Sequence, residues 1–170
     1  DWVIFFQSFP LIGTEMCRQW IEDGVLTEDM LIDVWNNSDY LCRAFDTPEI
    51  SAKDLERFQF DAYINVNFFN NYNMLHGHYD RAIKKFSVQI DKYPFQIVAL
   101  ACRSKCYSLK GLVELAKNDI SAINKMRVES QEAKELYDRY QDGINSVINE
   151  IHNNISFLSG GVSPKGLCLC

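Results

Sequence analysis

Apolar residues recur at every third or fourth position through most of the chain, a period that predicts helices. Between residues 51 and 75 they form two stripes, which begin with Leu55 and Phe58 on one side and with Phe60 and Ile64 on the other. A helix that is apolar on two sides has to be covered on two sides. We therefore expect the helix at 51–75 to be central in a mainly α fold.

Glycine and proline divide the following residues into further helices. Gly77 and Gly111 stand at predicted tight turns between helices, and Pro94 ends the helical unit between them. Antiparallel helical hairpins joined by short turns are how α-solenoids build a core. The apolar positions from Ala133 to Leu158 are close to a heptad seam, which predicts a helix that caps the stack or pairs with another helix.

The beginning of the chain follows a different pattern. Residues 3–6 are a continuous apolar run of strand length, typical of a strand buried on both faces of a parallel sheet. Pro10 and Gly13 then predict a sharp turn in which Gly13 takes a positive φ. Thr14 is the expected N-cap of a short helix, and Thr27 that of a second one. A strand–turn–helix unit is therefore expected before the helical region.

These patterns predict three regions in the 170 residues. Residues 1–50 hold the strand, the turn and the short helices, residues 51–159 form the helical domain, and residues 160–170 are a flexible tail. The polar stretch at 36–50 is expected to be a connecting loop.

Charge and hydropathy exclude several classes of function. The formal net charge of −6 argues against a nucleic-acid binder, because affinity for a phosphate backbone comes from clustered Lys and Arg. No apolar run is long enough to predict a membrane span, and the opening residues do not resemble a signal peptide. The six cysteines are dispersed, so we expect reduced thiols in a cytoplasmic protein.

Two pairs of residues have side chains of the kind that bind metal ions. Cys102 and Cys106 lie one helical turn apart, but a metal site needs more ligands, and we expect both to pack as small buried hydrophobic residues. His76 and His78 flank a glycine and are expected to be exposed turn residues. No catalytic residue and no metal ligand is assigned, and Cys168 with Cys170 receives no role.

An asparagine cluster leaves two interpretations open. Its members are Asn65, Asn67, Asn70, Asn71 and Asn73. They could hydrogen-bond a ligand or peptide. Alternatively, they are the polar stripe of a helix whose apolar stripes are buried, and this second interpretation is favoured.

The spacing of small, aromatic and proline residues in one segment resembles the second half of a tetratricopeptide (TPR) repeat. The matching positions are Gly77, Ala82, Phe86 and Pro94. The next pair of helices resembles it again without the final proline, at Gly111, Ala116 and Ile120. The resemblance covers roughly residues 60–125 and implies a degenerate, TPR-like helical segment.

The unit "FPLIGTEM" resembles the C-terminal edge of the barrel in radical S-adenosylmethionine (radical SAM) proteins with a cobalamin-binding domain. In that family a strand ends in a Pro-x-Pro-Gly-Thr turn. Pro10, Gly13 and Thr14 match the turn, while Ile12 replaces the second proline. "NVNFFNNYN" and "GHYDRAIKKF" then follow in the family's order.

The resemblance implies that Pro10, Gly13 and Thr14 form a cofactor-binding turn at the mouth of an α/β barrel, of which residues 1–50 are a remnant. The other interpretation of the turn is a purely structural connection. The family's cluster loop, C-x3-C-x2-C, is absent, since only Cys102-x3-Cys106 occurs. The chain then resembles an accessory part that is not catalytic by itself.

In such a parent protein an upstream barrel domain is the partner. That domain would bind the 4Fe-4S cluster, S-adenosylmethionine and, in members that carry it, cobalamin. The alternative function is a stand-alone TPR-like module whose groove takes a peptide or a protein helix. The sequence does not identify a substrate or a reaction subtype.

Overall fold

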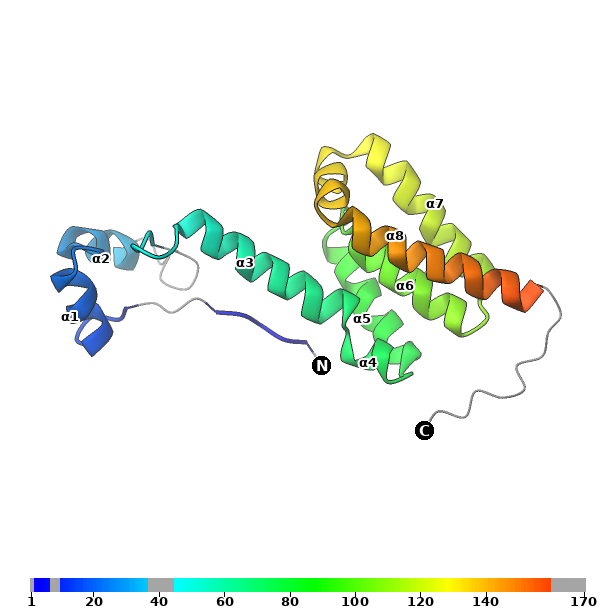
Figure 1. Cartoon of the computed structure of the whole chain (residues 1–170), viewed down its shortest axis with the longest axis horizontal. Helices are drawn as coiled ribbons and strands as arrows, with labels where there is room; N and C mark the ends of the chain where they lie inside the picture. The colour runs from blue at the N-terminus through cyan, green and yellow to red at the C-terminus, as the bar shows by residue number, and fades with distance from the viewer. Residues whose placement is uncertain (1, 7–9, 37–44, 160–170) are drawn as a thin grey trace. The chain divides into compact units, whose positions relative to one another are not determined.

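The computed structural model describes residues 2–6, 10–36 and 45–159, and these residues are mainly helical (Figure 1). They divide into two compact units, an N-terminal unit of residues 2–64 and a C-terminal unit that begins at Asn65. The sequence predicts a boundary between a barrel remnant and a helical domain at residue 50. This functional boundary differs from the division into compact units and stays a prediction. Within the described ranges, every helix is too short or too polar to cross a membrane.

The N-terminal unit contains α1 (Glu15–Glu22), α2 (Glu28–Asn36) and α3 (Ala52–Ile64). The predicted caps of the first two helices are confirmed. Thr14 Oγ accepts a hydrogen bond from the Cys17 amide at 3.3 Å, and Thr27 Oγ accepts one from the Met30 amide at 3.2 Å. A small core holds the unit's first helices together, and its buried members are Cys17, Leu26, Leu31 and Phe45.

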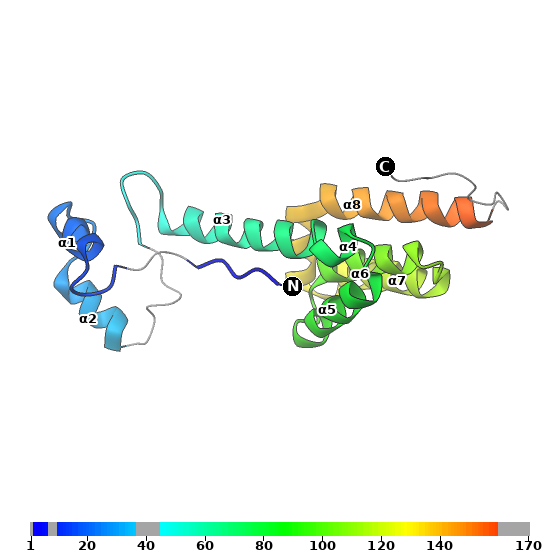
Figure 2. The same cartoon turned by 90° about the horizontal axis from the view of Figure 1, so that it is seen from below.

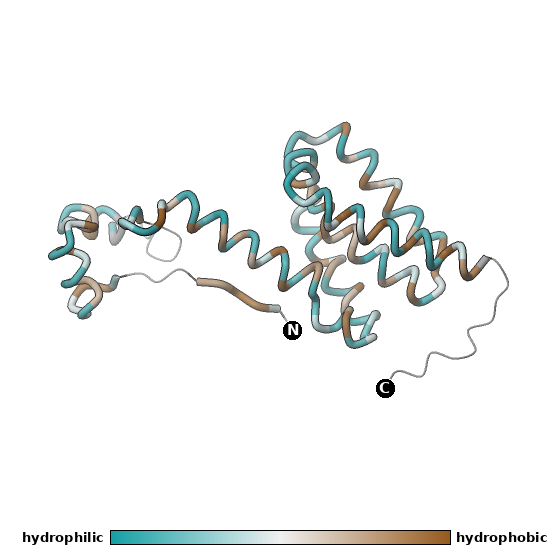
Figure 3. Tube along the Cα trace, viewed as in Figure 1, coloured by the Kyte–Doolittle hydropathy of each residue, from teal (hydrophilic) through white to brown (hydrophobic). Residues whose placement is uncertain are grey.

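The predicted strand at residues 3–6 is not formed in the described part of the chain. These residues are extended alongside α3, where the Phe5 carbonyl accepts a hydrogen bond from Gln59 Nε2 at 2.6 Å. A strand is held by a neighbouring strand, and the described residues contain none. The segment is apolar along its length (Figure 3). The barrel edge to which it was assigned stays a prediction.

The prediction that the helix at 51–75 is central is wrong. Ile64 is the buried residue of α3, whereas Phe58 and Phe60 are 54% and 37% exposed. The helix also does not continue in α form to residue 75. It passes into a π-helical turn, η1 (Asn65–Phe69), and then a separate helix, α4 (Tyr72–Leu75). Apolar residues are common on protein surfaces, so two apolar stripes did not establish burial on two sides.

The C-terminal unit adds α5 (Tyr79–Lys92), α6 (Ile97–Leu109), α7 (Val113–Glu129) and α8 (Gln131–Ser159). The predicted turns are confirmed, with Gly77 at φ 74° and Gly111 at φ 73°. α6 contacts α5, α7 and α8, and Figures 1 and 2 both show it among them. It is therefore the central helix of this unit.

The sequence of α6 explains its position. Its buried residues are distributed around the helix and are mostly small or aliphatic: Ile97, Val98, Ala99, Leu100, Ala101, Cys102, Ser104, Cys106 and Ser108. Small side chains let neighbouring helices approach on several sides. The buried serines keep hydrogen-bond partners, since Ser104 Oγ donates to the Ala116 carbonyl at 2.8 Å.

Positions that carry the TPR resemblance lie in this core. Ala82, Phe86 and Ala116 have no exposed surface, and the Phe86 ring lies 6.0 Å from the Phe68 ring in a stacked pair. Helices joined by short turns are present, but membership of the TPR class stays a prediction.

The predicted last helix is confirmed as α8, with a kink. Tyr140 has non-helical φ and ψ of −119° and 21°. Buried apolar residues continue on both sides of the kink, from Ala133 to Ile151. The predicted flexible tail at 160–170, including Cys168 and Cys170, lies outside the described residues.

Candidate functional site

The turn before α1 is built by Gly13 and Thr14. Gly13 has a φ of 86°, as predicted, which favours glycine. The Thr14 hydroxyl donates to the Leu11 carbonyl at 2.6 Å and accepts from the Cys17 amide. Both hydrogen-bonding capacities of this hydroxyl are thereby used to hold the turn and cap the helix.

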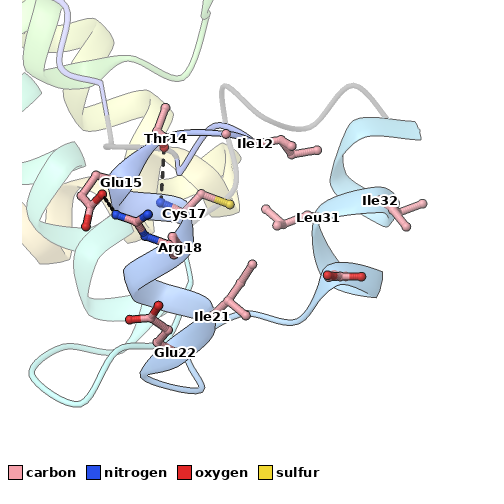
Figure 4. Close-up of a pocket in the computed structure, with 11 residues that line it drawn as sticks. Ile12, Thr14, Glu15, Cys17, Arg18, Ile21, Glu22, Leu31 and Ile32 are labelled. Atoms are coloured by element: carbon pink, nitrogen blue, oxygen red, sulfur yellow. Dashed lines mark hydrogen bonds and ion pairs between the residues drawn. The ribbon is translucent and has the colours of Figure 1, made fainter.

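A groove of about 590 Å³ runs beside this turn, between α1 and α2 (Figure 4). It is lined by Ile12, Gly13, Thr14, Glu15, Cys17, Arg18, Ile21, Glu22, Glu28, Leu31 and Ile32. The structure thus brings two of the three predicted site residues to one groove. The third, Pro10, is buried and does not line it.

The groove combines an apolar surface with acidic side chains. Figure 4 shows Ile21 on α1 and Leu31 on α2 on opposite sides of the open space. Glu15 and Arg18 form an ion pair on one turn of α1. The volume lies within the range of small-molecule and peptide-anchor pockets. The described lining residues combine apolar side chains with carboxylates, so the groove can bind a ligand that has both apolar and cationic groups.

A second cavity, of about 550 Å³, lies in the C-terminal unit between η1 and α8. Its lining is largely polar and consists of Asn65, Phe69, Asn70, Leu75, Lys105, Arg139, Tyr140, Asp142, Gly143, Ser146, Val147 and Glu150. Lys105 Nζ lies 2.5 Å from Glu150 Oε2. π-helical turns such as η1 are frequent at functional sites.

A close approach of two elements shapes this cavity. The Phe69 ring of η1 lies against Gly143 of α8 so closely that a Cβ on Gly143 would be 2.7 Å from Phe69 Cζ. The same ring is 6.3 Å from the ring of Tyr140, where α8 is kinked. The glycine therefore permits η1 to pack on α8 at the kink.

The structure divides the asparagine cluster. Asn65 and Asn70 line the second cavity, whereas Asn67, Asn71 and Asn73 are buried. The Asn71 side chain accepts a hydrogen bond from the Met74 amide at 3.2 Å and donates to the Asn67 carbonyl at 2.9 Å. The favoured prediction of a polar helix stripe is therefore wrong for the buried members, because the regular helix ends at η1 and Asn71 becomes the N-cap of α4.

The cysteines of α6 are buried, as predicted. Cys102 and Cys106 have no exposed surface and are free thiols, as is the buried Cys17. Burial raises the pKa of the Cys106 thiol to about 12 and that of Cys102 further. Such thiols are protonated at neutral pH and unreactive.

The histidines at the Gly77 turn are exposed, also as predicted. The His76 ring stacks on the Tyr72 ring at 4.1 Å, and His76 Nδ1 lies 2.8 Å from the Tyr72 carbonyl oxygen. Across the described ranges no group of three or more His, Cys, Asp or Glu side chains is placed to hold a metal ion.

Comparison of the chain with known proteins finds no matching family model, curated protein or solved structure. The case for each cavity as a binding site therefore depends on the geometry of this structure alone.

The sequence did not lead us to predict two features of these cavities, namely the wall formed by Leu31 and Ile32 and the contact between Phe69 and Gly143. The first had a signal in the amphipathic spacing of α2, whereas the second joins residues 74 positions apart and had none.

Proposed function

We propose that this chain is the C-terminal, non-catalytic helical part of a radical SAM iron-sulfur oxidoreductase or methyltransferase of the cytoplasm. The order of motifs from "FPLIGTEM" to "GHYDRAIKKF" supports this proposal. The observation that carries it is the extended apolar segment at residues 3–6. Val3, Ile4 and Phe6 are 43%, 67% and 72% exposed, and a strand or domain packed on this segment would remove that apolar surface from water.

In this proposal the segment joins the sheet of an upstream barrel domain. Its backbone is already extended, and a neighbouring strand would supply the hydrogen bonds that strand formation requires. The turn at Pro10, Gly13 and Thr14 would then lie where barrel loops form binding sites. The parent's cluster, S-adenosylmethionine and cobalamin are assigned to the upstream domain, since this chain lacks the three-cysteine loop.

A second candidate function is a stand-alone TPR-like module that binds a peptide. The cavity between η1 and α8 favours it, because exposed Asn65 and Asn70 present amide groups that can hydrogen-bond an extended backbone. In this candidate function the N-terminal segment has no docking role.

Removal of residues 1–13 tests the first proposal. The shortened chain keeps the Thr14 cap of α1, so we expect unchanged helicity by circular dichroism together with higher solubility. A matched full-length variant, Val3→Ser with Ile4→Ser and Phe6→Ser, is expected to gain solubility in the same way. Unchanged solubility of both variants would contradict the docking role of the segment and favour the peptide-binding module.

A further inference from the structure

Three isoleucine side chains that line the groove between α1 and α2 are exposed to solvent. Ile12, Ile21 and Ile32 are 66%, 37% and 53% exposed, and all three line the groove. Figure 4 labels all three, Ile12 before α1, Ile21 on α1 and Ile32 on α2. Clefts lined mainly by apolar side chains with a few polar groups are the usual form of a binding pocket.

The charges around the groove have one predominant sign. Its lining contains three glutamates and one arginine, a formal charge of −2. Arg18 is paired with Glu15, whereas Glu22 and Glu28 are exposed and have no ion-pair partner among the described residues. A partner that brings cationic groups to these two carboxylates would gain electrostatic complementarity.

The length of the walls suits a short helix. α1 has 8 residues and α2 has 9 residues. At a rise of about 1.5 Å per residue these helices are about 12–14 Å long, which matches two to three turns of a bound helix. Helices that bind in such grooves insert apolar residues at positions i, i+3 or i+4, and i+7.

We propose that this groove binds an amphipathic helix whose apolar stripe is flanked by lysine or arginine. The apolar stripe contacts Ile12, Ile21 and Ile32, and the basic residues lie beside Glu22 and Glu28. This inference goes beyond the proposed function, because it requires no iron-sulfur parent and concerns a surface other than residues 3–6.

The probe is a fluorescent 14-residue helical peptide with leucine at positions i, i+4, i+7 and i+11 and lysine on either side of that stripe. A second peptide carries glutamate in place of lysine, and a third has the lysine peptide's composition in scrambled order. Binding to the full chain is measured by fluorescence anisotropy at low and high salt. We expect the lysine peptide to bind at least tenfold more tightly than the other two.

Variants of the chain test whether binding takes place in the groove. Glu22→Gln with Glu28→Gln keeps the shape of the walls and is expected to weaken binding five- to tenfold at low salt, with a smaller effect at high salt. Ile12→Ala with Ile32→Ala is expected to weaken binding by a similar factor at both salt concentrations.

Control substitutions distinguish the groove from attraction by the acidic chain as a whole. Glu129→Gln with Glu135→Gln removes the same charge from the exposed surface of the C-terminal unit, and is expected to leave affinity unchanged. Val128→Ala removes apolar surface at a residue that is 87% exposed outside the groove, with the same expectation. Equal binding of the lysine and glutamate peptides, no binding of either, or equal effects of the groove and control variants would overturn the proposal.

Discussion

Arg103 of α6 and Asp119 of α7 are joined by two hydrogen bonds, from Nε to Oδ2 at 2.8 Å and from Nη2 to Oδ1 at 2.7 Å. Their side chains are only 18% and 9% exposed. Arg103 Nη1 also donates to Ser87 Oγ of α5 at 3.0 Å. The hydrogen bonds to Asp119 raise the pKa of Arg103, so this guanidinium stays charged while it ties three helices together.

Removal of one partner of this pair is expected to destabilise the C-terminal unit strongly. Asp119→Ala leaves the Arg103 charge largely buried and unpaired, which costs about 3 kcal/mol of unfolding free energy. The exposed pair Lys125–Glu129, at 3.8 Å, provides the control, and Glu129→Ala is expected to cost less than about 1 kcal/mol. Urea unfolding measures both, and equal losses would contradict the structural role of the buried pair.

The Phe69–Gly143 contact predicts that Gly143→Ala lowers the unfolding free energy when Phe69 is present and raises it when Phe69 is replaced by alanine. Gly143→Ala places a Cβ against the Phe69 ring, and is expected to destabilise the chain by about 1 kcal/mol despite alanine's better helix propensity. In a Phe69→Ala background the obstruction is gone, and the same substitution is expected to stabilise by about 0.5–1 kcal/mol. Unfolding curves of the four chains test this, and the same sign in both backgrounds would show that the contact is not tight.

The buried thiols of α6 predict a loss of stability in alkaline solution. Cys106 has a folded-state pKa of about 12 against an ordinary value of 9.0, and the pKa of Cys102 is raised above 9.0 as well. The unfolded chain therefore releases protons first as the pH rises. The stability that these thiols contribute is complete below pH 9 and declines as the pH rises from there toward the folded-state pKa.

Between pH 8 and pH 10 each thiol is expected to lower the unfolding free energy by about 1 kcal/mol. The double variant Cys102→Ala with Cys106→Ala removes this contribution but keeps the alkaline titration of the other residues. The difference in pH dependence between wild type and variant is the quantity to measure. Parallel curves would show that the two thiols are accessible to solvent.

The N-cap of α1 predicts a local effect. Thr14→Ala removes the hydroxyl that accepts from the Cys17 amide and donates to the Leu11 carbonyl, and a lost cap costs about 1 kcal/mol. Hydrogen exchange at the first amides of α1 should become about fivefold faster. Thr14→Ser keeps the hydroxyl and should retain the wild-type rate. Equal acceleration in both variants would mean that the cap does not depend on the hydroxyl.

Local chemistry made much of the helical pattern predictable. Thr14 and Thr27 have the hydroxyl that an N-cap requires, and Gly77 and Gly111 stand where the chain needs a positive φ. These signals depend on neighbouring residues alone.

Features that depend on distant neighbours could not be predicted in this way. The strand expected at residues 3–6 needs a second strand, and the central position of α6 depends on three helices that contact it. The residues of the candidate site also fall into a part that was predictable from local sequence and a part that was not. Gly13 and Thr14 were found from the turn signature, while Leu31 joins the groove only through the packing of α2.

The proposal that this chain is the C-terminal part of a radical SAM enzyme is tested most directly by sequencing the reading frame upstream of Asp1. We predict an in-frame extension that encodes a C-x3-C-x2-C loop within an α/β barrel domain. A stop codon followed by a start codon just before Asp1 would contradict the claim and leave the peptide-binding module as the function to test.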